Sequence, residues 1–171
     1  FIPALEDTGL ILEVGQWVLE TASQQIAAWA KQPEMSHLTV AVNVSAQQFR
    51  EADFVDKVLA TITRTGADPN RLKLELTESL LVDHAQESIE KLVALRARGV
   101  SFSLDDFGTG YSSLAQLTRL PVNVLKIDRA FVDGIERSEE SRAIIRAVIG
   151  IARSLGLKLV AEGVETGAQQ R

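Results

Sequence analysis

Apolar residues recur along the chain with two alternating spacings. Between Leu10 and Trp29 they return every three or four residues, which predicts an amphipathic helix with Trp17 and Trp29 in the core. The same spacing recurs in three later segments, 54–65, 88–98 and 141–155. Short β-rich runs lie between the helices, at 38–45, 72–77, 100–104, 122–127 and 157–163. A further short helix is predicted over 114–120. This alternation predicts an α/β fold with a mostly parallel sheet.

Two architectures fit this alternation, an open doubly wound sheet and a (β/α)8 barrel. The five predicted strands favour the open sheet, because a complete barrel has eight strands and roughly 250 residues. Polar residues favour the barrel, since one lies at or near the C-terminal end of each predicted strand. They are Asn43, Glu75, Asp105, Lys126 and Glu162. Such groups meet at one point only if the strands curve around an axis, so we predict part of a (β/α)8 barrel.

These polar residues, together with Asp106, offer oxygen ligands to a cation. Asp105 and Asp106 are adjacent, and neighbouring carboxylates become tolerable when cations neutralise them. Carboxylate and amide oxygens suit Mg²⁺ or Mn²⁺ rather than zinc. Two such ions about 3.5–4 Å apart are the usual device for in-line attack of water on a phosphodiester. Lys126 adds a cation that can orient the water or hold a phosphate oxygen.

The charge and composition narrow the class of partner. The net charge of −5 argues against a DNA or RNA polymer or a membrane surface as partner, because these need a basic face. A small phosphorylated ligand remains compatible, since bound metal ions supply positive charge locally. The 171 residues include no cysteine, which fits a reducing compartment, and we expect a cytoplasmic location.

Taken singly, the same residues have ordinary structural interpretations. Asn43 alone would most often cap a strand end, and Lys126 with Asp128 could form a structural ion pair. Glu75 alternates with apolar neighbours and could lie on a solvated face. A glutamate within a strand covered on both sides is rarely merely solvated, however, so the convergence of several such residues favours a site.

Five segments resemble, in order, the motifs of the EAL domain, the bacterial cyclic di-GMP phosphodiesterase. They are VNVSAQQF (42–49), LELTES (74–79), DDFGTGYSSL (105–114), LKIDRAFV (125–132) and VAEGVE (160–165). Each motif alone is weak, but five in register over essentially the whole chain are specific. The resemblance implies a (β/α)8 barrel that uses Mg²⁺ or Mn²⁺ to hydrolyse cyclic di-GMP to linear pGpG.

The resemblance also implies a role for each matching residue. Four residues match metal ligands of the family: Asn43, Glu75, Asp105 and Glu162. Asp106 matches a ligand of the second metal, and Lys126 matches the lysine that contacts the hydrolytic water, so Lys126 and Glu162 are the expected catalytic residues. Glu78 matches a glutamate that anchors the loop after Asp106. Family members use that loop in dimer contacts, which predicts a homodimer.

The chain departs from the family pattern at both ends. The Glu-Ala-Leu signature, whose glutamate is a metal ligand on the first strand, is absent, and the family's later strands would follow Arg171. We therefore expect residues 1–171 to be a single partial EAL domain, truncated at both ends, comprising roughly strands two to six and inactive alone. The parent protein is expected to carry sensory or GGDEF-type domains and can be membrane-tethered elsewhere.

Three functions remain open from the sequence. The first is a metal-dependent cyclic di-GMP phosphodiesterase. The second is a non-catalytic EAL-type module that binds cyclic di-GMP or a protein partner. The third is an unrelated metal-dependent barrel enzyme acting on a phosphorylated or enolisable metabolite. The matching positions present in this chain all carry the family's residues, which favours the first function.

Overall fold

The computed structural model describes residues 1–82, 85–108 and 117–170, and for residue 82 only the backbone. The predicted glycine-rich loop over 109–116, on which the dimer prediction depends, lies outside the described residues. The start of the helix predicted over 114–120 lies outside them too.

Five parallel strands form the sheet: β1 (Val40–Asn43), β2 (Leu72–Thr77), β3 (Ser101–Phe107), β4 (Val124–Ile127) and β5 (Lys158–Ala161). Their hydrogen-bonded order is the chain order, β1-β2-β3-β4-β5. A doubly wound sheet reverses its strand order at a switch point, whereas a barrel adds each strand next to the preceding one. The α/β prediction is therefore confirmed, and the strand order is that of a barrel.

The described helices precede, separate and follow the strands. Those before β3 are α1 (Ile2–Thr8), α2 (Ile11–Trp29), α3 (Ala46–Arg50), α4 (Phe54–Thr65), the 3₁₀ turn η1 (Pro69–Arg71), α5 (Glu78–Val82) and α6 (Ala85–Arg96). Those after β3 are α8 (Arg129–Gly134), α9 (Glu139–Leu155) and α10 (Gly167–Gln170). None of the described helices is long and apolar enough to cross a membrane.

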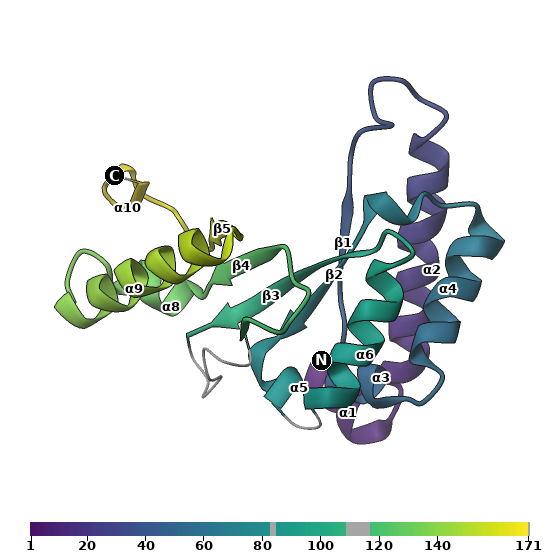
Figure 1. Cartoon of the computed structure of the whole chain (residues 1–171), viewed down its shortest axis with the longest axis horizontal. Coiled ribbons are helices and arrows are strands. Elements are labelled where there is room, and N and C mark those ends of the chain that lie inside the picture. Colours follow the sequence, from purple (N-terminus) through teal and green to yellow (C-terminus); the bar gives the residue numbers. More distant parts are fainter. Residues whose placement is uncertain (83–84, 109–116, 171) are drawn as a thin grey trace. The chain divides into compact units, whose positions relative to one another are not determined.

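The chain divides into two compact units. The first contains Phe1–Glu75 and Glu90–Ser101, and the second contains Leu76–Ile89 and Phe102–Arg171. In the first unit, α2 packs against α4 and β1, and the two long helices run side by side in Figure 1. Phe54, Val58 and Ile62 recur every four residues on α4 and are buried. Gly66, with a φ of 71°, then ends the helix in the left-handed conformation that favours glycine.

The prediction that Trp17 lies in the core is wrong. Its side chain is 65% exposed, whereas Leu19, Ala22 and Ile26 of the same helix are buried. Twelve residues of helix correspond to about 3.3 turns, so Trp17 and Trp29 point about 120° apart and cannot share one face.

Ser23 on α2 is fully buried, and among the buried side-chain oxygens and nitrogens of the described residues its Oγ is the one without a hydrogen-bond partner. Ser23→Ala should therefore raise the free energy of unfolding by about 0.5–1 kcal/mol, because it removes an unpaired buried hydroxyl and improves helix propensity. Urea unfolding measures this. Ser154→Ala on α9 is the control, since Ser154 is exposed and its Oγ already donates to the Gly150 carbonyl at 2.9 Å. An equal increase in the free energy of unfolding at both positions would mean that helix propensity alone causes the gain at Ser23.

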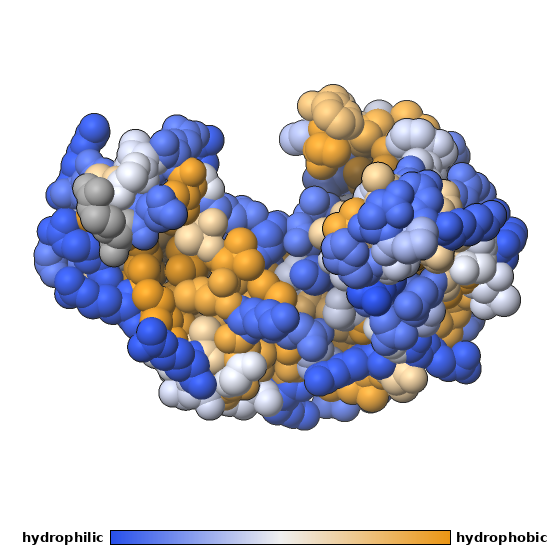
Figure 2. Space-filling model, turned by 90° about the horizontal axis from the view of Figure 1, so that it is seen from above, coloured by the Kyte–Doolittle hydropathy of each residue, from blue (hydrophilic) through white to orange (hydrophobic). Residues whose placement is uncertain are grey.

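In the second unit, β3, β4 and β5 pair in parallel, and α9 packs against α8, β4 and β5 (Figure 1). The Ser138 hydroxyl accepts a hydrogen bond from the Ser141 amide and caps the start of α9. Val148 and Ala152 form the buried face of the helix. In the view of Figure 2, hydrophilic residues cover much of the surface and hydrophobic residues gather in patches between them. Exposed apolar residues of this unit include Leu155, Val160 and Val164.

Candidate metal centre

An acidic cluster lies in the second unit, at the C-terminal ends of its strands. Asp105, Asp106 and Glu162 each offer a carboxylate oxygen, and these oxygens lie within 4.8 Å of one another. All three side chains are partly buried. The two aspartates directly precede Phe107, the last residue of β3, and Glu162 follows β5 directly. Parallel strands bring their carboxyl ends to one edge of the sheet, so residues 57 positions apart in sequence meet there.

A β-bulge turns the two adjacent aspartates toward the same cluster. Leu104 pairs with Leu125 and Phe107 pairs with Ile127, so β3 advances three residues where β4 advances two. The extra residue is accommodated at Asp106, whose φ of 55° is the one positive value among the described residues other than glycine. Aspartate tolerates this left-handed conformation better than most residues. On a regular strand the two carboxylates would point to opposite faces.

Lys126 lies between two of the carboxylates. Its Nζ is 3.1 Å from Oδ2 of Asp105 and 2.6 Å from Oε1 of Glu162. Lys126 stands on β4, and the amide of Glu162 donates to the carbonyl of Ile127 at 3.2 Å, which fixes Glu162 beside β4. The ammonium therefore has a defined position, supplied by strand pairing on both sides of β4.

Asp128 also lies close to the cluster, although its sequence position alone suggested only an ion pair with Lys126. It follows β4 directly and caps α8, where its Oδ1 accepts from the Ala130 amide at 2.7 Å. Its carboxylate also accepts a hydrogen bond from the carboxyl group of Asp106 when Asp106 is protonated. The signal that could have identified Asp128 is its position, because an acidic residue immediately after a parallel strand is a candidate ligand.

Burial is the main factor that raises the pKa of Asp106 above its ordinary value. The negative charge of Asp105 raises this pKa further, followed by the hydrogen bond and charge of Asp128 and then by the charge of Glu162. At a given pH the neutral form of Asp106 is thus more populated in the folded chain than in the unfolded chain when no divalent cation is bound.

Asp106→Asn should therefore stabilise the metal-free protein increasingly as pH rises. Below the ordinary aspartate pKa of about 3.9, both variants carry a neutral group and differ little. Above it, the unfolded wild-type chain ionises first and the folded chain binds more protons, so wild-type stability falls as pH rises through the raised pKa. Chemical unfolding in EDTA between pH values of about 3 and 8 measures the difference. Asp56→Asn, at an exposed position on α4, is the control, and a pH-independent difference for Asp106→Asn would contradict the expectation.

Glu78 lies at the start of α5 and is only 3% exposed. Its Oε2 accepts a hydrogen bond from the amide of Gly108 at 3.1 Å. Gly108 has a φ of 101°, and an added Cβ would lie 3.2 Å from the Phe131 ring, so both its conformation and its surroundings favour glycine. The structure thus connects Glu78 to the residue two positions after Asp106.

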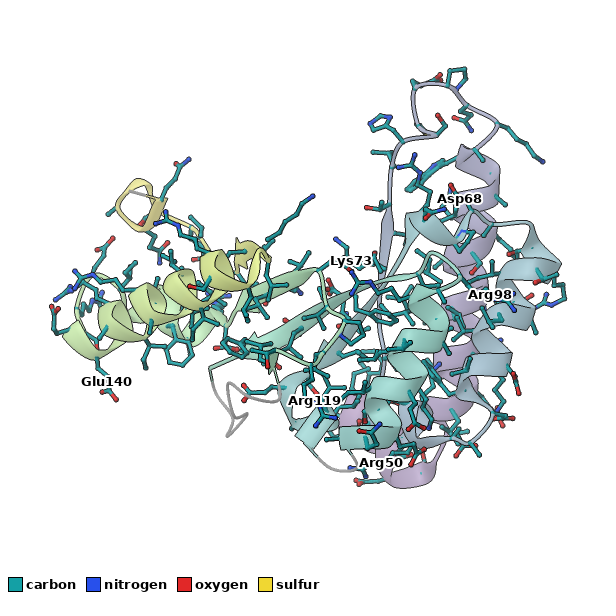
Figure 3. The ribbon with its side chains drawn as sticks, viewed as in Figure 1. Arg50, Asp68, Lys73, Arg98, Arg119 and Glu140 are labelled. Carbon is teal, nitrogen blue, oxygen red and sulfur yellow. The ribbon has the colours of Figure 1, made fainter. Side chains whose placement is uncertain are left out.

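Asn43 and Glu75 lie in the first unit, where Asn43 is the last residue of β1 and Glu75 lies two residues before the end of β2. They are register partners in the parallel pair, and the Val44 amide donates to the Glu75 carbonyl at 3.0 Å. Along β2 the leucines are buried and the alternate residues are partly exposed, so Lys73, labelled in Figure 3, and Glu75 occupy the same face. The structure therefore brings these two predicted ligands together in the first unit, and the other predicted ligands together in the second.

The turn after Glu162 is held by α8. Gly163 has a φ of 70°, and an added Cβ would lie 2.5 Å from Cγ of Arg129, so the arginine stem packs directly over the glycine. The Arg129 guanidinium contacts Asp133 at 3.1 Å and Glu165 at 2.9 Å. These pairs are exposed and individually weak, but together they connect the turn to a helix.

The donor set of the second unit fits a hard divalent cation. Asp105, Asp106 and Glu162 supply carboxylate oxygens that already converge, as Mg²⁺ and Mn²⁺ require. No histidine or cysteine belongs to this cluster of described residues, so its chemistry does not resemble that of a zinc site.

Comparison with known proteins identifies the class to which this fold and site belong. The model of the EAL domain family matches residues 1–171, and the chain belongs to that family. It is 46% identical over 170 residues to the bifunctional diguanylate cyclase/cyclic di-GMP phosphodiesterase MucR of Pseudomonas aeruginosa. That match covers 99% of this chain but 25% of MucR, so the chain spans about a quarter of this curated relative.

Solved structures of the family share the fold. The structure of the MucR phosphodiesterase in complex with cyclic di-GMP has a TM-score of 0.95 and 46% identity, over 99% of this chain and 68% of that one. The calcium and manganese complexes of Klebsiella pneumoniae BlrP1 with cyclic di-GMP have TM-scores of 0.75 and 0.74 and identities of 30% and 29%. Both cover 91% of this chain and 40% of BlrP1. Together with the strand order, these matches confirm the predicted incomplete barrel.

Proposed function

We propose that the protein containing this chain hydrolyses cyclic di-GMP to linear pGpG with Mg²⁺ or Mn²⁺. The observation that carries this proposal is the convergence of Asp105, Asp106 and Glu162 around the ammonium of Lys126. Membership in the EAL family supports it and removes the alternative of an unrelated metal-dependent barrel. The named activity of MucR and the manganese complex of BlrP1 point to the same substrate and metal.

Asp105, Asp106 and Glu162 are the proposed metal ligands of the second unit. Asn43 and Glu75, from the family motifs VNVSAQQF and LELTES, are the proposed ligands of the first. Bound divalent ions would supply Lewis acidity at the phosphate and at the attacking water. The Asp106 conformation directs its carboxylate before any ion binds, and burial limits the competing solvent around it.

Lys126 and Glu162 are the proposed catalytic residues. The Lys126 ammonium has three donors, so it can hold the attacking water or a phosphate oxygen while it stays paired with a carboxylate. Its position on a strand with neighbours on both sides keeps the donor geometry fixed during reaction. Glu162 orients the ammonium through the 2.6 Å contact.

The direct test measures conversion of cyclic di-GMP to pGpG by the whole protein. Turnover should require Mg²⁺ or Mn²⁺, stop on thorough chelation and be inhibited by Ca²⁺, whose looser geometry misplaces the reacting water. Turnover that survives chelation would contradict the proposal. Binding of cyclic di-GMP without turnover under saturating Mn²⁺ would instead favour the alternative of a non-catalytic EAL-type module.

Glu78→Ala should lower the rate without removing a proposed metal ligand. Loss of the Gly108 contact should loosen the end of β3 and weaken metal binding through Asp106, so excess Mg²⁺ should partly restore the rate. Steady-state rates over a Mg²⁺ titration measure this. Glu78→Gln is the matched control, since its amide oxygen can still accept from Gly108. A rate loss that no Mg²⁺ concentration relieves would argue against this coupling.

Three further features extend the proposal beyond the site. We propose that residues 1–171 belong to one EAL domain, that the domain forms a homodimer through the loop after Asp106, and that the protein acts in the cytoplasm. Regulatory domains elsewhere in the protein are expected because MucR carries a diguanylate cyclase activity as well.

A further inference from the structure

Lys126 places a cation inside the acidic cluster itself. Its Nζ contacts Oδ2 of Asp105 at 3.1 Å and Oε1 of Glu162 at 2.6 Å. The three side chains are 13%, 16% and 34% exposed, so solvent screens these contacts only in part. Asp105 and Glu162 are also two of the three residues whose oxygens converge closely enough to hold a metal ion.

An ammonium in this position and a divalent ion compete for the same negative charge. Mg²⁺ binds carboxylate oxygens at about 2.0–2.1 Å, which would bring it within a few ångströms of the ammonium. Two positive charges at such a separation repel strongly where water is partly excluded. The attraction of the carboxylates for an incoming ion is therefore reduced by the extent to which Lys126 already neutralises them.

Strand β4 holds the Lys126 backbone in place by pairing with a strand on each side. On one side of β4, Leu125 pairs with Leu104, and on the other side Lys126 pairs with Val160. The Lys126 side chain reaches the cluster from a strand that is paired on both sides, so the position of Lys126 itself does not depend on the ordering of a loop. A single ammonium against three carboxylates still leaves excess negative charge, which preserves attraction for a divalent ion.

We infer that Lys126 is the internal counter-ion of the metal-free cluster and that it sets the metal affinity by competition. It holds Asp105 and Glu162 together before metal binds, and it gives up part of these contacts when an ion enters, becoming available to the reacting water. This inference rests on the proposed function for the identity of the ion, but it concerns metal affinity rather than turnover.

The test compares Mn²⁺ binding by the whole protein and three variants at constant pH and ionic strength. Free Mn²⁺ is measured by electron paramagnetic resonance, and thermal unfolding is measured in parallel in EDTA. Lys126→Met removes the charge at similar length, and Lys126→Arg retains it. Lys158→Met removes a lysine from β5, at the end of the strand away from Glu162, and is the matched control.

Lys126→Met should bind Mn²⁺ at least about tenfold more tightly than the wild type. In EDTA it should unfold several degrees lower, because Asp105 and Glu162 then repel each other without the Lys126 ammonium between them. Lys126→Arg and Lys158→Met should stay close to wild type in both measurements. If Lys126→Met folds only when Mn²⁺ is present, that result also supports the inference. If Lys126→Met does not fold at all, Lys126→Gln takes its place in both measurements.

Unchanged or weaker Mn²⁺ binding by the uncharged variants would overturn the inference. Equal tightening in Lys126→Arg would also overturn it, because the cause would then be shape rather than charge. Failure of the proposed function is separable from failure of this inference. If the variants show the change in Mn²⁺ affinity but the protein does not hydrolyse cyclic di-GMP, the counter-ion role of Lys126 stands and the proposed function fails. If the protein is active but the variants show no change in Mn²⁺ affinity, the proposed function stands and the counter-ion role fails.

Discussion

Asp105→Asn should lower the rate of cyclic di-GMP hydrolysis by at least about a thousandfold at physiological Mg²⁺, because metal ions supply most of the charge stabilisation in such reactions. Asparagine keeps the size of the side chain but removes the negative charge that is proposed to bind metal and that pairs with Lys126 at 3.1 Å. The expected loss includes weaker metal binding, so raising the Mn²⁺ concentration should recover only part of the rate. Single-turnover kinetics with metal titration measure both effects.

Asp56→Asn is the matched control for this substitution. Asp56→Asn makes the same chemical change at an exposed position in the first turn of α4. Its rate should stay within about twofold of wild type, since exposed substitutions rarely have large effects. A near wild-type rate in Asp105→Asn would remove Asp105 from the proposed ligand set.

Lys126→Met should lose about two to three orders of magnitude in kcat at saturating Mn²⁺, the usual cost of removing one preorganised donor from an active site. The reason is the loss of the donor proposed to hold the attacking water or a phosphate oxygen. Metal binding should not be lost, so the defect should persist at every Mn²⁺ concentration. Rates for Lys126→Met and Lys158→Met at several metal concentrations measure this, and near wild-type kcat in the first variant would assign Lys126 to structure alone.

The long helices and the strands were predictable because their signals are local and repeated. The spacing of Phe54, Val58 and Ile62, with Gly66 at the end, predicts the observed bounds of α4. The strand over 72–77 was predicted with its observed bounds too, since its leucines alternate with polar residues. Helices of five or six residues, such as α3, α5 and α8, complete too few turns to show periodicity and were not predicted.

The meeting of Asp105, Lys126 and Glu162 in one cluster follows from a general property of parallel strands, so the sequence could predict it. The conformation of Asp106 could not be predicted, because a left-handed residue other than glycine leaves no compositional signal. The strand was accordingly expected to end at Leu104, whereas β3 continues through the bulge to Phe107.

The bulge in β3 also determines how this acidic pair could be transferred to another protein. Leu104 and Phe107 are three positions apart, so on a regular strand their side chains would lie on opposite faces. Both are buried here, because the extra residue of the bulge brings Phe107 back to the face of Leu104. Grafting Asp-Asp onto a regular strand of a host barrel would send one carboxylate into the apolar layer. A successful graft must copy the four residues from 104 to 107 with their unequal pairing, so the transferable unit is a backbone geometry rather than a dipeptide.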